Sequence, residues 1–260
     1  MISDETVKNL FEECIGNLSP EMLASKQEVA QFFRGVTSRQ WKNNPYPGYA
    51  CQRHKKVFNA FKVIPEYCFS CYKISILPRN VLELFKLMIV FDNIELPDNN
   101  TRKCMLEVRP KIAGTYKGYI FFQSLEEAKV TLPFVQEVIA KHISSNIQVE
   151  IKKGCSEYKL AYPDYVYDPN DESRMMKYRN DWKKFEDYVD KNMLGEFTPL
   201  ELDTYGTPGA PGMEVRDVQV MRTWIAFAAS IGDLSYKKIT DEPEWEMSWV
   251  KENLPNFKVM

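Results

Sequence analysis

The sequence predicts an α+β protein with a ferredoxin-like βαββαβ sheet at its core. Between residues 72 and 152 the apolar patterns follow the order strand, helix, strand, strand, helix, strand, which is the order of that fold. The composition is that of a globular chain, since 44% of the 260 residues are hydrophobic and 27% are charged. Two short cysteine and histidine motifs before the first strand predict a zinc knuckle beside the sheet.

These patterns divide the chain into four segments. Residues 1–50 are expected to form an N-terminal helical segment, and residues 51–72 the zinc knuckle. Residues 72–160 form the predicted ferredoxin-like core, and residues 161–260 a helical C-terminal region that packs on it.

The N-terminal segment carries helix signals over residues 3–41. Ser19 followed by Pro20 is typical of a helix start, because Pro is favoured at the first helical position. Residues 25–28 (Ser-Lys-Gln-Glu) fit a capping box. Residues 43–50 contain two prolines and a glycine, and they predict a loop that leads into the knuckle.

Four strands and two helices make up the predicted core. The strands are expected at residues 72–77, 103–109, 115–122 and 146–152. A helix over residues 80–90 has one apolar face, and a capping box at residues 124–127 opens a second helix that extends to about residue 144. Pro133 lies inside this second helix and is expected to kink or restart it.

Alternation along the strands assigns a face to each side chain, because helices are expected to cover only one side of the sheet. The apolar side carries Ile74, Ile76, Leu106, Val108, Ile120, Phe122, Ile147, Val149 and Ile151. The open side, which is a working surface or a solvated face, carries Lys73, Ser75, Met105, Glu107, Arg109, Lys117, Tyr119, Phe121, Gln148, Glu150 and Lys152.

The C-terminal region contains two predicted helices, over residues 172–194 and 215–231. The loop at residues 206–212 is not a phosphate loop, because it lacks Gly-Lys-Ser/Thr and contains two prolines. Trp245 and Trp249 lie one helical turn apart and are expected to dock the tail onto the body.

The strongest chemical signal is the pair Cys51 and His54, followed after thirteen residues by the pair Cys68 and Cys71. Three of the six cysteines and one of the two histidines fall within these 21 residues. Structural Zn²⁺ takes four such ligands in a tetrahedron, so two knuckle turns joined by a hairpin or short strand would complete a site. Because four protein ligands leave no position for water, the predicted Zn²⁺ is structural.

Other interpretations of the motif are free buried thiols with a surface histidine, or an iron–sulfur cluster, which a histidine ligand suits less well. A zinc deaminase is excluded, because no Glu stands two positions after His54 and no Pro directly precedes Cys68. Cys104 and Cys155 are expected near opposite edges of the sheet, unpaired, with Cys155 a buried thiol rather than a nucleophile.

Net charge and hydropathy indicate which classes of partner the chain is suited to bind. A net charge of −2 gives no general attraction to nucleic acid or to anionic membrane. The apolar runs are too short to span a bilayer, and the acidic N-terminus lacks the features of a signal peptide. The sequence therefore predicts a cytoplasmic protein with no membrane partner.

Residues 117–122 (Lys-Gly-Tyr-Ile-Phe-Phe) are similar to the RNP1 strand of RNA-recognition modules, which reads basic, Gly, aromatic, any residue, aromatic. The resemblance implies that Lys117, Tyr119 and Phe121, with Arg109 beside them, bind single-stranded nucleic acid by stacking and phosphate contacts. It covers six residues, and acidic side chains on the same face depart from it.

We therefore expect a zinc-stabilised binding module whose partner is single-stranded nucleic acid or a protein. The alternative is a small-molecule enzyme with its active site on the open sheet face, under the C-terminal helices. In that case Glu107 and Glu150 would act as acid and base, and Arg102 and Lys103 would bind an anionic substrate.

Overall fold

The computed structural model describes residues 1–16, 37–41, 50–109, 112–193 and 215–239. Within these ranges the chain is an α+β protein with one five-stranded antiparallel sheet, in the order β1-β3-β4-β2-β5, and seven α-helices. The strands are β1 (Ser38–Trp41), β2 (Tyr72–Leu77), β3 (Arg102–Leu106), β4 (Tyr116–Phe122) and β5 (Gln148–Lys153). The helices are α1 (Asp4–Gly16), α4 (Cys51–Phe61), α5 (Val81–Asn93), α6 (Leu125–His142), α7 (Ser156–Ala161), α8 (Lys183–Asn192) and α9 (Val215–Ser230).

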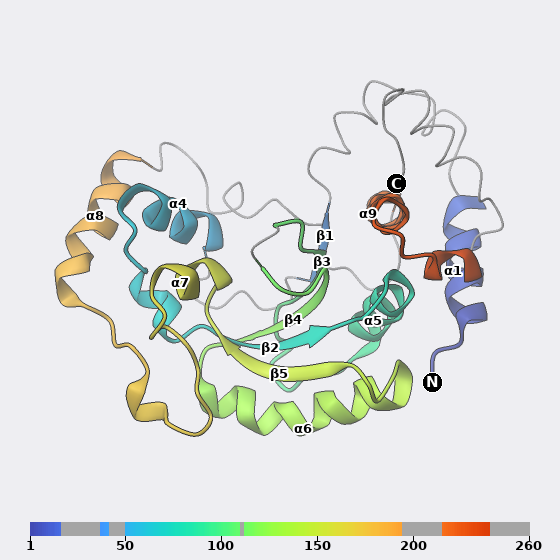
Figure 1. The fold of residues 1–260 in the computed structure, drawn as a ribbon, viewed down its shortest axis with the longest axis horizontal. Helices are drawn as coiled ribbons and strands as arrows, with labels where there is room; N and C mark the ends of the chain where they lie inside the picture. Colours follow the sequence, from blue (N-terminus) through green and yellow to red (C-terminus); the bar gives the residue numbers. More distant parts are fainter. Residues whose placement is uncertain (17–36, 42–49, 110–111, 194–214, 240–260) are drawn as a thin grey trace.

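The helices form two groups (Figure 1). Helices α4, α7 and α8 lie together at one end of the molecule, whereas α1, α5 and α9 lie together at the other end. Helix α6 runs along the sheet and contacts β2, β4 and β5. The elements predicted from residues 72–152 are all present, in the predicted order.

The main hydrophobic core lies between the sheet and the helices α5, α6 and α9. The predicted inward alternation of the strands is confirmed, since Ile74, Ile76, Leu106, Ile120, Phe122 and Ile147 are buried in this core. Val149 and Ile151 pack against it while partly buried. The predicted burial of Val108 is wrong, because β3 ends at Leu106 and the Val108 side chain is 57% exposed.

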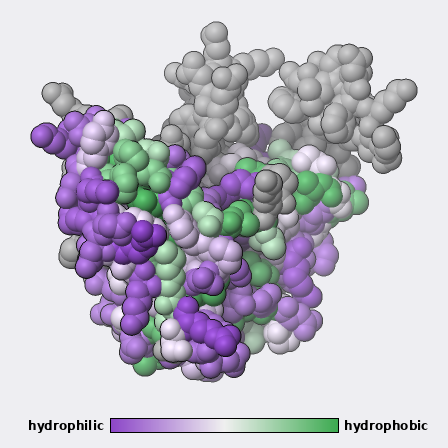
Figure 2. Space-filling model, turned by 60° about the vertical axis from the view of Figure 1, so that its left-hand side comes forward, coloured by the Kyte–Doolittle hydropathy of each residue, from purple (hydrophilic) through white to green (hydrophobic). Residues whose placement is uncertain are grey.

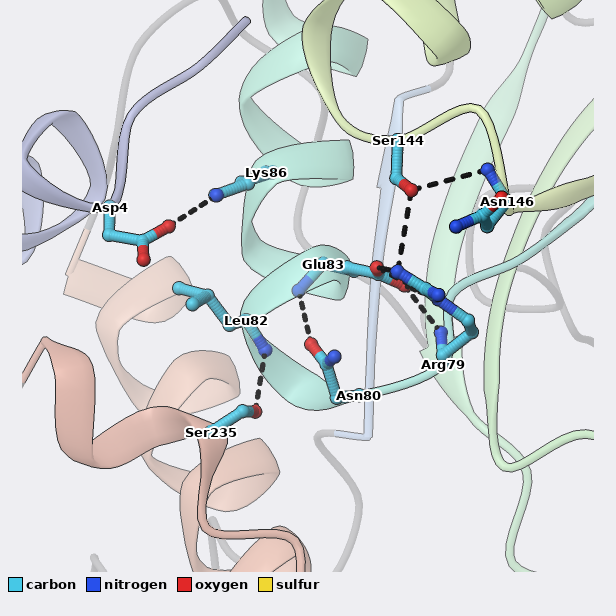
Figure 3. A network of polar contacts seen from close by, with 9 residues as sticks. All are labelled: Asp4, Arg79, Asn80, Leu82, Glu83, Lys86, Ser144, Asn146 and Ser235. Carbon is cyan, nitrogen blue, oxygen red and sulfur yellow. Dashed lines mark hydrogen bonds and ion pairs between the residues drawn. The ribbon is translucent and has the colours of Figure 1, made fainter.

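The start of α5 is closely capped (Figure 3). The side chain of Asn80 accepts a 2.9 Å bond from the Glu83 amide, and the Glu83 carboxylate accepts a 2.7 Å bond from the Arg79 amide. The Leu82 amide donates to the hydroxyl of Ser235 at 3.3 Å. These bonds satisfy amides that a helix start leaves without an internal partner, and they fasten the segment after α9 to α5.

Residues 38–41 were expected to continue the N-terminal helix and instead form β1, which pairs with β3. Two side chains on the same side of β1, Arg39 and Trp41, are buried. Both bind the carboxylate of Asp92 on α5, each at 2.7 Å. Pairing with the sheet edge and this shared carboxylate outweigh the local helical pattern.

A second group of buried side chains lies outside the main core and joins α4, α7 and α8. We call it the aromatic cluster; its buried members are Val57, Phe58, Val63, Ile64, Cys68, Tyr158, Tyr165, Trp182 and Val189. Arg53 of α4 binds Glu186 of α8 at 2.6 Å and Asp190 of α8 at 2.7 Å. These contacts make the end of the molecule that carries α4, α7 and α8 a packed unit of its own.

The helix expected over residues 172–194 forms as α8 only from Lys183 onward. Ahead of it, the Met176 amide donates to the Asp164 carbonyl oxygen at 3.1 Å, and the Met176 carbonyl oxygen accepts from Lys153 at 3.3 Å. Because these backbone groups bond to distant segments, they do not continue a helix. Helix α6, by contrast, continues through Pro133.

Several predicted features lie outside the described residues. They are the helix start at Ser19 and Pro20, the capping box at residues 25–28, most of the loop at 43–50, the loop at 206–212, and the pair Trp245 and Trp249. Among the helices that the structure describes, none is long and apolar enough to span a bilayer. The face shown in Figure 2 is mostly hydrophilic, with hydrophobic residues gathered in small groups.

Candidate metal centre

One small cavity of about 20 Å³ is lined by four cysteines and one histidine, which come from three separate segments. A cavity of this size has room for one water-sized sphere. The predicted residues Cys51, His54, Cys68 and Cys71 all line it, and Cys155 joins them. Its other lining residues are Tyr67, Lys73, Phe121, Gly154 and Tyr158.

Cys51 and His54 lie on the first turn of α4 and not on the predicted knuckle turn. The prediction of a hairpin or strand after them was wrong, because Val57 and Phe58 are buried in the aromatic cluster at helical spacing from His54. Residues three apart on a helix share a face, so α4 presents both side chains to the same side. The helix ends at Phe61, and the next residue, Lys62, has a left-handed φ of 58° that turns the chain toward the second pair.

Cys68 and Cys71 lie on a 3₁₀ turn (Glu66–Phe69) and at the residue before β2. The Cys68 amide donates to the Pro65 carbonyl oxygen at 3.0 Å, and the Cys71 amide to the Cys68 carbonyl oxygen at 3.4 Å. The hydroxyl of Tyr165 donates to the Cys68 carbonyl oxygen. This pair therefore has the tight-turn geometry that the spacing predicted.

Cys155 comes from the third segment, the turn between β5 and α7. Gly154 before it has a φ of +51°, and a Cβ there would lie 2.1 Å from the hydroxyl oxygen of Tyr165. Only glycine fits such a turn without strain. We expected Cys155 to stand apart as a buried thiol, and the only signal for its position was a Gly-Cys step directly after the last strand.

Burial sets the protonation of the donors. It lowers the pKa of His54 to about 4, so the imidazole is neutral at pH 7. It raises the pKa of Cys71 to about 12 and that of Cys68 well above its usual value. The ring of His54 also stacks on Tyr67, with centroids 5.1 Å apart. Neutral imidazole is the form that binds a metal, whereas these thiols would release protons on binding one.

A buried lysine faces the donors from the sheet. Lys73 of β2 is 7% exposed, lines the cavity, and lies over the rings of Tyr119 at 4.5 Å and Phe121 at 5.8 Å. Such placement over aromatic faces stabilises an ammonium group. The side of the sheet predicted to be open is therefore covered where it meets the cysteines.

The residues expected to bind nucleic acid are not an open platform. Tyr119 and Phe121 are each 7% exposed and Lys117 only 1% exposed, so the expectation of exposed stacking rings was wrong. Glu107 is buried between Lys117, at 3.4 Å, and Arg109, at 2.6 Å. Arg109 also pairs with Glu157 of α7, although its own side chain is 43% exposed.

The glycine of the RNP1-like stretch has a packing role in this fold. A Cβ on Gly118 would lie 2.4 Å from the Cδ2 atom of Leu87, so glycine allows α5 to approach β4 closely. This contact gives the glycine of the Lys-Gly-aromatic pattern a packing role.

The residues weighed for an enzyme are dispersed. Glu150 pairs with Lys152 at 3.0 Å on the surface, and neither lines the cavity. Arg102 donates to the carbonyl oxygen of Phe91 at 2.6 Å. Cys104 is fully buried in the main core and is not among the residues that line the cavity.

Chemically, four thiols and an imidazole suit a borderline-soft ion such as Zn²⁺. Within the part of the chain that the structure describes, no three His, Cys, Asp or Glu side chains stand close enough together to hold a metal ion. The donors thus line one cavity without forming a ligand shell.

No protein-family model, curated protein or solved structure matches this chain. Fold and site together define an α+β protein with a buried cavity lined by cysteines and a histidine.

Proposed function

We propose that the protein is a zinc-stabilised binding module whose ion is structural. The observation that carries the proposal is the shared cavity, to which α4, the turn before β2 and the turn after β5 each contribute donors. Clustered thiols and imidazole are the ligands of structural zinc. The set predicted from the sequence is Cys51, His54, Cys68 and Cys71.

The location of the cavity supports a structural role for the ion. Cys68 belongs to the aromatic cluster, whereas Lys73 and Phe121 belong to strands of the sheet. An ion bound there would fasten the unit of α4, α7 and α8 to the sheet. Its binding free energy would then be part of the folding free energy.

A ferredoxin-like assignment of the sheet belongs to the same proposal. Strands β3, β4, β2 and β5 are adjacent in that order and antiparallel, and α5 and α6 connect them in a βαββαβ sequence. Strand β1 is then an addition at the β3 edge.

Single-stranded nucleic acid stays a prediction for the module's ligand. Support for it is limited to exposed basic groups such as Arg109 and Lys152, whose side chains are 43% and 37% exposed. The enzyme alternative required Glu107 and Glu150 in one pocket, and the cavity contains neither. The metal site is therefore the part of the proposal with the strongest support.

Elemental analysis of the freshly purified full chain tests the proposal. We expect one zinc per chain in the unaltered protein, and loss of zinc with partial unfolding in Cys68→Ser. Cys104→Ser is the matched control, because Cys104 is equally buried but lies in the main core. Zinc-free protein that melts normally, or equal zinc in both variants, would refute the structural ion.

A further inference from the structure

We propose that Cys155 is the fourth ligand of this ion, so that four thiolates hold it and His54 stands beside the shell. The inference rests on the proposed function, because it assumes that the cavity takes Zn²⁺. A tetrahedral ion accepts four protein ligands, and the cavity offers five. Four donors follow from the sequence motif, and the structure adds Cys155 as a competitor for the fourth position.

The backbone holds Cys155 beside the second cysteine pair. The Gly154 amide donates a 2.8 Å bond to the Cys71 carbonyl oxygen. The Tyr158 amide bonds to the Cys155 carbonyl oxygen at 3.0 Å, and the Tyr158 hydroxyl contacts the Cys68 sulfur at 3.6 Å. One short stretch of chain is thus bonded to both Cys68 and Cys71.

The four thiols also interact electrostatically with one another. Cys155 and Cys51 each raise the pKa of both Cys68 and Cys71. Of the three other thiols, Cys155 raises the pKa of Cys68 the most. The three segments thus deliver four sulfurs to the lining of one cavity.

Charge balance favours four thiolates over three thiolates and an imidazole. Lys73 is buried at the cavity, and burial lowers the pKa of the partly buried Lys103 on β3 to about 8, against the opposing effect of Cys51 and Cys155. Among the described residues, no carboxylate forms an ion pair with either lysine. Four thiolates on one divalent cation carry a net charge of about −2 and would balance both ammonium groups. Replacing one thiolate by a neutral imidazole would leave one buried positive charge without compensation.

His54 has other neighbours. Its ring stacks on Tyr67, and the neighbouring Arg53 binds Glu186 and Asp190 in the ion network between α4 and α8. Beside the shell it would pack against the sulfurs and help exclude water, as groups around a metal's ligands commonly do.

Zinc K-edge X-ray absorption of the purified full chain counts the ligands directly. We expect four sulfur neighbours at about 2.3 Å and no nitrogen near 2.0 Å. Three sulfurs and one nitrogen would overturn the role of Cys155 while leaving the zinc module intact. Protein without zinc would overturn both proposals, so the two failures are distinguishable.

Two variants give a second readout after reconstitution with Co²⁺. In Cys155→Ser the sulfur-to-cobalt charge-transfer absorbance should fall by about one quarter, since one of four thiolates is lost. In His54→Gln it should stay unchanged. The reverse pattern, an unchanged Cys155→Ser spectrum and an altered His54→Gln spectrum, would assign the fourth position to the histidine.

Discussion

The amide of Gly154 donates a 2.8 Å hydrogen bond to the carbonyl oxygen of Cys71, and this bond brings the end of β5 to the cysteine pair before β2. The two residues are distant in sequence and adjacent in the sheet, because Tyr72 pairs with Lys153. This relationship places Cys155 at the cavity. It also makes Gly154 a position at which the site and the stability of the fold can be tested together.

Gly154→Ala should destabilise the protein more than Gly232→Ala. Both glycines have positive φ, +51° and +81°, but a Cβ meets the ring of Tyr165 only at position 154. Strain alone costs about 1 kcal/mol or more, and the steric overlap adds about 1–3 kcal/mol. Urea unfolding of both variants measures the difference, and equal losses would show that the Tyr165 contact is not restrictive.

Tyr119→Ala should lower the stability of the fold, whether or not the protein binds a ligand there. The ring is buried and covered by Lys73, so its loss leaves a cavity that costs about 3 kcal/mol. Thermal melting should show this loss. Arg109→Ala, with a 43% exposed side chain, is the better probe of nucleic-acid binding. If folded Tyr119→Ala melts normally and loses binding to labelled single-stranded RNA, the ring is a stacking surface after all.

Asp233 should contribute an acid-sensitive part of the stability. Burial favours a raised pKa, but hydrogen bonds from Tyr116 and from the amides of Ser235 and Val81 outweigh it and hold the pKa of Asp233 below its ordinary value. A depressed carboxyl pKa stabilises the fold above the unfolded value of about 3.9, and this contribution is lost as the pH falls through the folded value.

Asp233→Asn therefore tests whether the stability contributed by Asp233 is lost as the pH falls. The variant should lose about 1–3 kcal/mol at pH 7, because the neutral amide binds the three donors less strongly. Its stability should then fall less steeply than that of the unaltered protein as the pH falls below about 4. Parallel stability curves for the two proteins across this range would contradict the assignment.

Glu186 should be the residue that most firmly joins α8 to α4. Its carboxylate binds Arg53 at 2.6 Å, the Glu66 amide at 2.8 Å and the Tyr178 hydroxyl at 2.9 Å. Glu186→Ala leaves the Glu66 amide and the Tyr178 hydroxyl without this acceptor and leaves Arg53 with Asp190 alone, so it should cost about 3 kcal/mol.

The next residue provides a matched control for Glu186→Ala. Asp187 is 58% exposed and pairs with Lys183 on its own helix, so Asp187→Ala should leave denaturant unfolding almost unchanged. Similar losses in both variants would mean that the contact between α8 and α4 does not depend on the buried carboxylate.

The core of the fold was predictable because its signals are local. Strand alternation located β2 to the residue, and the capping box that begins at Ser124 marked the start of α6. Strand β1 was not predictable in the same way. Its short sequence is stabilised by distant partners, Asp92 on α5 and the edge of β3.

The site was predictable in part. Spacing identified Cys51, His54, Cys68 and Cys71, which line one cavity. Cys155 could not be linked to them from the sequence, because only the pairing of β2 with β5 brings it near. The burial of Phe121 was also hidden, since this residue lines the cavity together with residues of α4 and α7.

A crystal structure with anomalous data collected on both sides of the zinc edge tests the central claim most directly. We expect one strong zinc peak in the cavity, within about 2.3 Å of the sulfurs of Cys68 and Cys71. A cavity without an anomalous peak, or a zinc ion bound at another place on the chain, would contradict the account.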